Sequence, residues 1–213
     1  MSDSYLKGTL TLILGGVRSG KSRFGQELAH QLGGDNVLFV ATAESRDAEM
    51  ARRIDKHRQT RPIAWQTLER PLKTGIAIAA YDALQTVVLV DCLTLLVSNV
   101  LLANEAELNS LDGIAAIENR MLAEVDDLIR VAENHETHLI VVSGEVGMGL
   151  VPETALGRLF RDMLGWSNQR IAARATSTYI MFAGLPINAS SLTCSVQKAA
   201  QVLCCTRESV AIQ

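Results

Sequence analysis

Short apolar runs alternate with longer amphipathic segments along most of the chain, and this alternation predicts βαβ units around a parallel sheet. Most of the expected strands are nearly continuous hydrophobic runs, which is typical of strands covered by helices on both faces. The expected strands are Leu10–Leu14, Val37–Ala41, Ile63–Thr67, Thr86–Val90, Leu139–Ser143 and Thr178–Ala183. The pattern therefore predicts an α/β fold, with a mostly parallel sheet flanked by helices on both faces.

The helices expected between these strands carry apolar residues at helical spacing. They are Lys21–Leu32, Asp47–Arg58, Leu72–Tyr81, Leu93–Leu102, Leu111–Glu136 and Pro152–Ala175. Gly33 and Gly34 suit the end of the first helix, and Pro152 suits the first turn of the last. We expect one domain over residues 1–187, followed at 188–213 by a tail to which the pattern assigns no order.

Composition narrows the class of protein. The 213 residues are 48% apolar, which fits a single globular domain, and a net charge of -3 disfavours nucleic acid and anionic membrane surfaces as partners. No apolar run reaches the length of a membrane-spanning helix, and the first run enters a glycine-rich loop without a cleavage site. The four cysteines show neither zinc spacing nor a disulfide framework. We therefore expect a cytoplasmic protein without a membrane span.

A glycine-rich segment between the first expected strand and the first expected helix carries the candidate chemistry. It fits the pattern G-x-x-x-x-G-K-[ST] and consists of Gly15, Gly16, Val17, Arg18, Ser19, Gly20, Lys21 and Ser22. Glycines let successive backbone N–H groups face one phosphate, and the helix N-terminus adds partial positive charge. This context predicts a P-loop NTPase-like fold in which Lys21 reaches the β- and γ-phosphates of a nucleotide.

A magnesium site is expected beside this loop. The Ser22 hydroxyl is one predicted ligand, and Asp91, which ends the apolar run Val87–Val90, is a plausible Walker-B carboxylate for the same ion. Capping of the following helix is the alternative role for Asp91. The chain has no Asn-Lys-x-Asp motif for reading guanine, which disfavours a signalling GTPase. Small-molecule kinases and nucleotidyltransferases remain.

His57 lies in the basic run Arg52–Arg58 of the second expected helix. A run of this kind usually forms a solvated helix face. A neutral imidazole can also attack an α-phosphate to form a phosphoramidate, with neighbouring Arg and Lys offsetting the charge of the nucleotide. The residues alone leave both interpretations open.

The chain resembles one family, the bifunctional adenosylcobinamide kinase/adenosylcobinamide-phosphate guanylyltransferases of cobalamin biosynthesis. The resemblance covers nearly the whole chain before residue 188, and it includes the P-loop and the longer E-V-G-M-G-x-V-P-E stretch at 145–153. The other matching segments are 41–43, 49–57, 61–62, 65–69, 90–94 and 168–169.

The resemblance implies two reactions on one scaffold. The first is phosphorylation, with ATP or GTP as donor, of the hydroxyl on the aminopropanol arm of adenosylcobinamide, a corrinoid. The second is transfer of GMP from GTP to that phosphate through a GMP-histidine intermediate, and His57 matches the histidine that carries GMP. The resemblance further implies Mg²⁺ and a homotrimer. A single-activity P-loop kinase with an inert His57 and a non-catalytic GTP-binding regulator are the alternatives.

The same matching implies nucleotide contacts outside the P-loop. They fall at Ala41, Thr42, Ala43, Arg58, Gln59, Thr60, Arg61, Glu69 and Asp91. Glu69 also makes chemical sense, because guanine presents two adjacent donors that one carboxylate can accept. An acid flanking the turn before Pro71 is the alternative for Glu69.

Other polar residues are weaker candidates. Glu145 is a candidate to orient or deprotonate the acceptor hydroxyl in the kinase step. Arginines of the last long helix are candidate phosphate clamps or, equally, partners of Asp162 and Glu153 in surface ion pairs. These arginines are Arg158, Arg161, Arg170 and Arg174.

Overall fold

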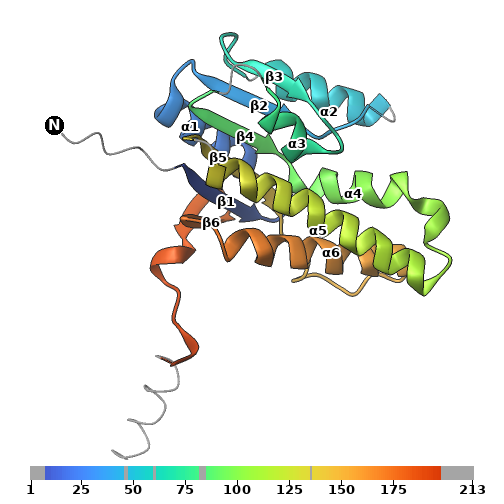
Figure 1. Ribbon diagram of the computed structural model, residues 1–213. Coiled ribbons are helices and arrows are strands. Elements are labelled where there is room, and N and C mark those ends of the chain that lie inside the picture. Colours follow the sequence, from blue (N-terminus) through green and yellow to red (C-terminus); the bar gives the residue numbers. More distant parts are fainter. Residues whose placement is uncertain (1–7, 46–47, 60, 82–84, 135, 198–213) are drawn as a thin grey trace, which may run out of the picture.

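The computed structural model describes residues 8–197 apart from 46–47, 60, 82–84 and 135. Its centre is a seven-stranded sheet of order β3-β2-β4-β5-β1-β6-β7 (Figure 1). The strands are β1 (Thr9–Gly15), β2 (Val37–Ala41), β3 (Gln66–Glu69), β4 (Val87–Asp91), β5 (His138–Gly144), β6 (Ser177–Phe182) and β7 (Leu185–Asn188). All pairings are parallel except the antiparallel β6–β7 pair, which confirms the predicted mostly parallel α/β sheet.

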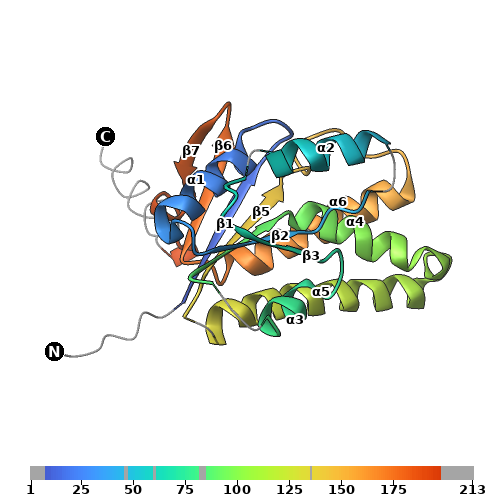
Figure 2. The ribbon, with the colours of Figure 1, turned by 90° about the horizontal axis from the view of Figure 1, so that it is seen from above.

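Helices cover both faces of the sheet. They are α1 (Lys21–Gly33), α2 (Ala48–Gln59), α3 (Thr74–Ala79), α4 (Leu93–Ala103), α5 (Leu111–Asn134) and α6 (Ala155–Ala172), with short 3-10 segments at Glu105–Glu107 and Ala189–Ser191. Seen from above in Figure 2, α3 to α6 lie on one side of the sheet, and α1 lies on the other.

Alternate residues of the strands face the two helical layers. Leu12 and Val40 belong to the core beneath α4, α5 and α6, whereas Ile13 and Phe39 belong to the core beneath α1. All four side chains are almost fully buried. Burying a side chain of this size stabilises the fold by about 1.5–3 kcal/mol. Because both faces of these strands are buried, consecutive apolar residues are favoured along them.

The third strand lies further along the chain than predicted. The expected strand was Ile63–Thr67, but Trp65 N donates to Pro62 O at 3.1 Å and closes a turn, so β3 begins only at Gln66. The Trp65 indole also donates to Gly34 O at 2.9 Å, which fixes this turn against the end of α1. The side chain of Ile63 is fully exposed. Apolar residues here belong to a turn and not to a buried strand.

Two helices also have boundaries that differ from the predictions, while the end of a third helix agrees. Pro152 precedes the last helix and is not in its first turn, because Thr154 is the N-cap and its side chain accepts a hydrogen bond from Gly157 N at 3.1 Å. The expected helix Leu72–Tyr81 shortens to Thr74–Ala79. Helix α1 ends at Gly33, with Gly34 at φ 55°, as the glycine pair predicts.

The sheet has an edge strand that the apolar pattern did not predict. Ala183 and Gly184 both have positive φ, 49° and 83°, and form the two-residue turn between β6 and β7. Turns with positive φ at both positions match the twist of antiparallel strands. The residues of β7 are all exposed, and Pro186 is compatible with an edge position, so burial gave no signal for this strand.

A close approach between helices makes Gly75 a test of the packing of α3 on α5. A Cβ at Gly75 would lie 2.4 Å from the carbonyl carbon of Asp127, so we expect Gly75→Ala to lower the free energy of unfolding by about 1–3 kcal/mol. Gly165 is the matched control in α6, because a Cβ there meets no described atom within 4 Å outside its own helix backbone and chain neighbours. Gly165→Ala should stabilise by about 0.5–1 kcal/mol through helix propensity. Urea unfolding of both variants measures the difference, and equal effects would contradict this packing.

Candidate nucleotide-binding site

The predicted P-loop forms between β1 and α1. Strand β1 ends at Gly15, and α1 begins at Lys21. Arg18 and Gly20 have left-handed backbones with φ of 58° and 95°, which curl the intervening segment. The Lys21 ammonium donates to Gly16 O at 3.0 Å across the loop. The backbone therefore has the strand–loop–helix geometry that presents N–H groups and a lysine to phosphate.

Strand register brings the other predicted acids to the same edge of the sheet. Ala41, the last residue of β2, lies opposite Glu69 of β3 on one side and Asp91 of β4 on the other. Because neighbouring strands are about 4.8 Å apart, the two acidic residues lie roughly 10 Å apart across Ala41. The loops after parallel strands thus converge where nucleotides bind in open α/β sheets.

A cavity of about 490 Å³ lies over the P-loop and joins these elements. Ten residues predicted for nucleotide or metal binding line it: Val17, Arg18, Ser19, Gly20, Lys21, Ser22, Ala41, Ala43, Arg61 and Asp91. The predicted magnesium ligands Ser22 and Asp91 are therefore in one cavity. The remaining lining residues are Arg23, Phe39, Met50, Ile54, Cys92, Thr94 and Leu95.

Phe39 lines the cavity and supports Arg61, a role that the sequence does not predict. Its ring lies beneath the Arg61 guanidinium, with the central carbon of that group 3.6 Å from the ring centroid. Within its apolar run, Phe39 reads as an ordinary buried strand residue. Phe39 and Arg61 are about twenty residues apart in the sequence, so no local sequence pattern predicts their contact.

Arg61 is a partly buried cation between two acids. Burial lowers its pKa, Asp91 and Glu69 raise it, and Arg58 lowers it. The guanidinium nevertheless stays charged, since arginine does not lose its proton in proteins. Its Nε is buried and has no hydrogen-bond partner among the described residues. A desolvated cation with an unused donor suits an anionic ligand such as phosphate.

A second cavity of about 350 Å³ adjoins the first, and Arg61 lines both. The residues that line it are Arg58, Arg61, Pro62, Ile63, Trp65, Thr67 and Glu69. Within it, Arg58 forms an ion pair with Glu69, and the hydrogen bond and charge of Glu69 raise the pKa of Arg58. The predicted contacts at Arg58 and Glu69 therefore belong to this second cavity.

Thr42 braces the site and does not line either cavity. Its side chain is fully buried, and its hydroxyl donates to Cys92 O at 2.7 Å and accepts from Cys92 N at 2.8 Å. The Asn99 amide donates to Thr42 O at 2.7 Å from beneath. The Thr42 side chain ties the end of β2 to the segment after β4, and the predicted nucleotide contact at Thr42 stays a prediction.

Three other predicted contacts do not line the two cavities described above. Gly15 and Gly16 belong to the P-loop backbone, and Gln59 is exposed at the end of α2. Thr60 lies outside the described residues. His57 lies in the last turn of α2, and its side chain is likewise outside the described part of the structure.

The loop after β5 is anchored against the P-loop. Glu145 N donates to Gly15 O at 3.1 Å, and the Thr94 hydroxyl accepts from Gly144 N at 2.7 Å. The Glu145 carboxylate accepts from Gly147 N at 2.5 Å, within its own loop. Glu145 is not among the residues lining the two cavities, so its predicted role with the acceptor hydroxyl remains a prediction.

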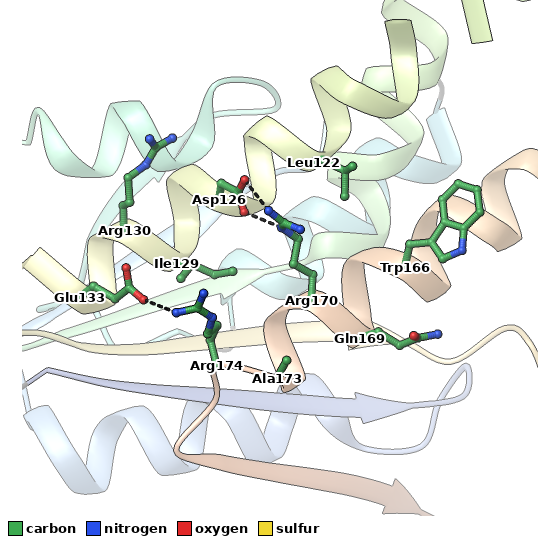
Figure 3. A pocket seen from close by; sticks show the side chains of 10 residues that line it. All are labelled: Leu122, Asp126, Ile129, Arg130, Glu133, Trp166, Gln169, Arg170, Ala173 and Arg174. Atoms are coloured by element: carbon green, nitrogen blue, oxygen red, sulfur yellow. Dashed lines mark hydrogen bonds and ion pairs between the residues drawn. The ribbon is translucent and has the colours of Figure 1, made fainter. Parts of the chain in front are cut away.

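The arginines of α6 do not converge on the P-loop. Figure 3 shows Arg170 and Arg174 on a groove between α5 and α6, whose lining includes no P-loop residue. Arg170 makes two hydrogen bonds to Asp126, at 2.5 and 2.8 Å, and lowers its pKa, while Arg174 pairs with Glu133 at 3.3 Å. The ion-pair interpretation holds for these two, although the partners come from α5 and are not the predicted acids. Arg158 donates to the carbonyls of Pro152 and Glu153.

Comparison with known proteins agrees with this site. A family model described as cobinamide kinase / cobinamide phosphate guanyltransferase matches residues 11–189. The chain belongs to this family. The match confirms the resemblance drawn from the sequence and makes the chain a member of an enzyme family whose described activities are a kinase and a guanyltransferase.

Individual relatives match over most of their length. The bifunctional adenosylcobalamin biosynthesis protein CobP of Pseudomonas aeruginosa is 40% identical over 176 residues, which is 83% of this chain and 94% of that protein. The proteins named CobU in Escherichia coli and Salmonella typhimurium are 38% and 37% identical, each over 84% of this chain and 98% of their own length. No helix among the described residues is long and apolar enough to cross a membrane.

The thiol of Cys92 gives a test of the environment at the cavity wall. Burial, and next the charge of Asp91, raise the pKa of this thiol to about 11. Only the thiolate is alkylated, so we expect the rate of modification by iodoacetamide to rise about tenfold per pH unit from pH 7 to 9 without levelling off. Peptide mass spectrometry separates Cys92 from the other cysteines. A rise of only about threefold between pH 8 and pH 9 would show an ordinary, solvated thiol, whose pKa is about 8.5.

Proposed function

We propose that this enzyme phosphorylates the aminopropanol hydroxyl of adenosylcobinamide, with ATP or GTP as donor, and then transfers GMP from GTP to the resulting phosphate. The products of the second step are adenosylcobinamide-GDP and pyrophosphate. Membership of the family and the names of the relatives support the two activities. The residue roles below rest on the geometry of the two cavities.

The observation that carries the proposal is that Arg61 lines both the cavity over the P-loop and the second cavity, which Glu69 also lines. One GTP molecule fits this arrangement, with its phosphates on the P-loop and its base in the second cavity. The carboxylate of Glu69 would accept the N1–H and N2 amino donors of guanine. Arg61, held over Phe39 between the two cavities, would then face the phosphates with its unused donor.

The donors in the P-loop cavity fit a magnesium ion. The Ser22 hydroxyl and the Asp91 carboxylate are oxygen donors on one cavity, and no cluster of three or more His, Cys, Asp or Glu residues occurs in the described part of the chain. Mg²⁺ commonly takes one or two protein oxygens and completes its shell with phosphates and waters. When bound, the ion would neutralise charge on the nucleotide, while Lys21 and the loop N–H groups orient the phosphates.

His57 is the proposed nucleophile of the guanylyl step. A neutral imidazole nitrogen attacks the α-phosphorus of GTP, a P–N bond forms, and the bond to the leaving pyrophosphate breaks. An oxygen of the cobinamide phosphate then attacks the same phosphorus and displaces the histidine. His57 adjoins Arg58 in α2, and Arg58 lines the second cavity, so one helix carries the proposed nucleophile and a residue of that cavity.

The covalent intermediate is directly testable. Incubation with Mg²⁺ and GTP should add one GMP to the intact protein, and peptide mass spectrometry should place it on His57. The adduct should disappear in His57→Ala and persist in His30→Ala, the matched control, because His30 is exposed at the end of α1 and lines neither cavity. Absence of an adduct while GTP is hydrolysed or transfers its γ-phosphate would favour the single-activity kinase.

Substitution of Lys21 tests the role of the P-loop in the kinase step independently of the nucleophile His57. We expect Lys21→Ala to lower kcat/KM of the kinase step by at least about a hundredfold, because a preorganised cation at transferring phosphates is a large electrostatic contribution. Arg120→Ala, which removes a surface cation paired with Glu107, is the control. Phosphate release or transfer from radiolabelled ATP gives the rates. Comparable rates in the two variants would contradict the assignment of the P-loop as the kinase site.

Assembly, location and domain limits are part of the same proposal. We infer a single catalytic domain over about residues 1–187, because the family match ends at residue 189. The resemblance to the family implies a homotrimer, and we propose the cytoplasmic location that the sequence analysis predicts. The corrinoid is the proposed small-molecule partner.

A further inference from the structure

Arg58 holds the carboxylate that the proposed function assigns to guanine. Its Nη2 donates to Glu69 Oε1 inside the second cavity, and both residues line that cavity. The pair joins the last turn of α2 to the end of β3. Under the proposed function, guanine and Arg58 would therefore have the same acceptor.

The two donors are chemically alike. A guanidinium presents parallel N–H groups to a carboxylate, and guanine presents its N1–H and N2 amino group along one edge in the same manner. Adenine has an acceptor at N1 and no 2-amino group, so it cannot replace the guanidinium. Guanine is thus the nucleobase that can exchange with Arg58 without leaving Glu69 unsatisfied.

The exchange is energetically accessible. The side chains of Arg58 and Glu69 are 50% and 55% exposed, and ion pairs of such exposure contribute little to stability. A released Arg58 would remain near charged groups, since Asp55 Oδ1 lies 3.7 Å from its Nη1. Arg58 and Arg61 both line the second cavity, and Arg61 also lines the cavity over the P-loop, so a released Arg58 would be close to the wall that the two cavities share.

We propose that Arg58 occupies Glu69 in the place of guanine when the site is empty, and that guanine displaces it and frees its guanidinium to bind the phosphates of the nucleotide. This inference rests on the proposed function, because it takes Glu69 as the guanine acceptor. It makes Arg58 a specificity-determining residue: an adenine nucleotide would leave Arg58 on Glu69, away from the phosphates.

Two measurements on Arg58→Gln test the proposal, because they should change in opposite directions. Guanosine carries no phosphate, so its affinity reports competition for Glu69 alone, and we expect Arg58→Gln to raise it by about two- to fivefold. The rate of GMP-adduct formation from GTP should fall by at least about tenfold, because the freed cation is missing. If Arg58 only stabilised the fold, Arg58→Gln would lower both the guanosine affinity and the rate of adduct formation. Arg120→Gln, which breaks an exposed Arg–Glu pair remote from the site, should change neither.

Glu69→Gln distinguishes failure of this inference from failure of the proposed function. If guanosine affinity is unchanged or reduced in Arg58→Gln while Glu69→Gln abolishes the preference for guanosine over adenosine, Arg58 does not compete and this inference is wrong. If adduct formation does not slow, the release of Arg58 to the phosphates is wrong. If the wild type shows no preference for guanosine and Glu69→Gln changes nothing, reading of guanine by Glu69 fails, and the inference fails with it. NMR titration with guanosine and adenosine measures these affinities.

Discussion

The parallel pairing of β2 with both β3 and β4 is the constraint on which the site depends. It places Glu69 and Asp91 on either side of Ala41 at the carboxyl edge of the sheet. A slip of one residue in either pairing would turn the acid to the other face of the sheet. Arg61 lines the cavity over the P-loop together with Asp91 and lines the second cavity together with Glu69, so it joins the two cavities.

Packing beneath this edge holds it in place. Phe39 supports the Arg61 guanidinium from below, and Thr42 ties the end of β2 to the segment after β4 through both backbone groups of Cys92. Asn99 reaches the same point from α4 and donates to the carbonyls of Thr42 and Pro71. Buried polar groups that are fully hydrogen-bonded rigidify a core, so the ligand-facing residues lie on a preorganised frame. The exposed Arg58–Glu69 pair is, by contrast, free to exchange partners.

Sequence reasoning succeeds where the physical cause is local. The P-loop follows from a glycine pattern between a strand and a helix, and five of the six predicted strands occupy nearly the predicted residues. Four of these strands, β1, β2, β4 and β5, are apolar runs that are buried along most of their length. It fails where the cause is distant in the chain. The turn at Trp65 depends on Gly34 O, the support of Arg61 depends on Phe39, and the pairing of Arg58 with Glu69 depends on sheet register. Strand β7 has no buried face, so no apolar run marks it.

The most direct test is a crystal structure of the protein with Mg²⁺ and a GTP analogue whose α,β bridge cannot be cleaved. The account predicts one nucleotide across both cavities, with its phosphates on the loop from Gly15 to Ser22, the edge of its guanine on Glu69, and Arg58 turned from Glu69 toward the phosphates. A base bound outside the cavity lined by Arg58, Arg61 and Glu69 would contradict the account.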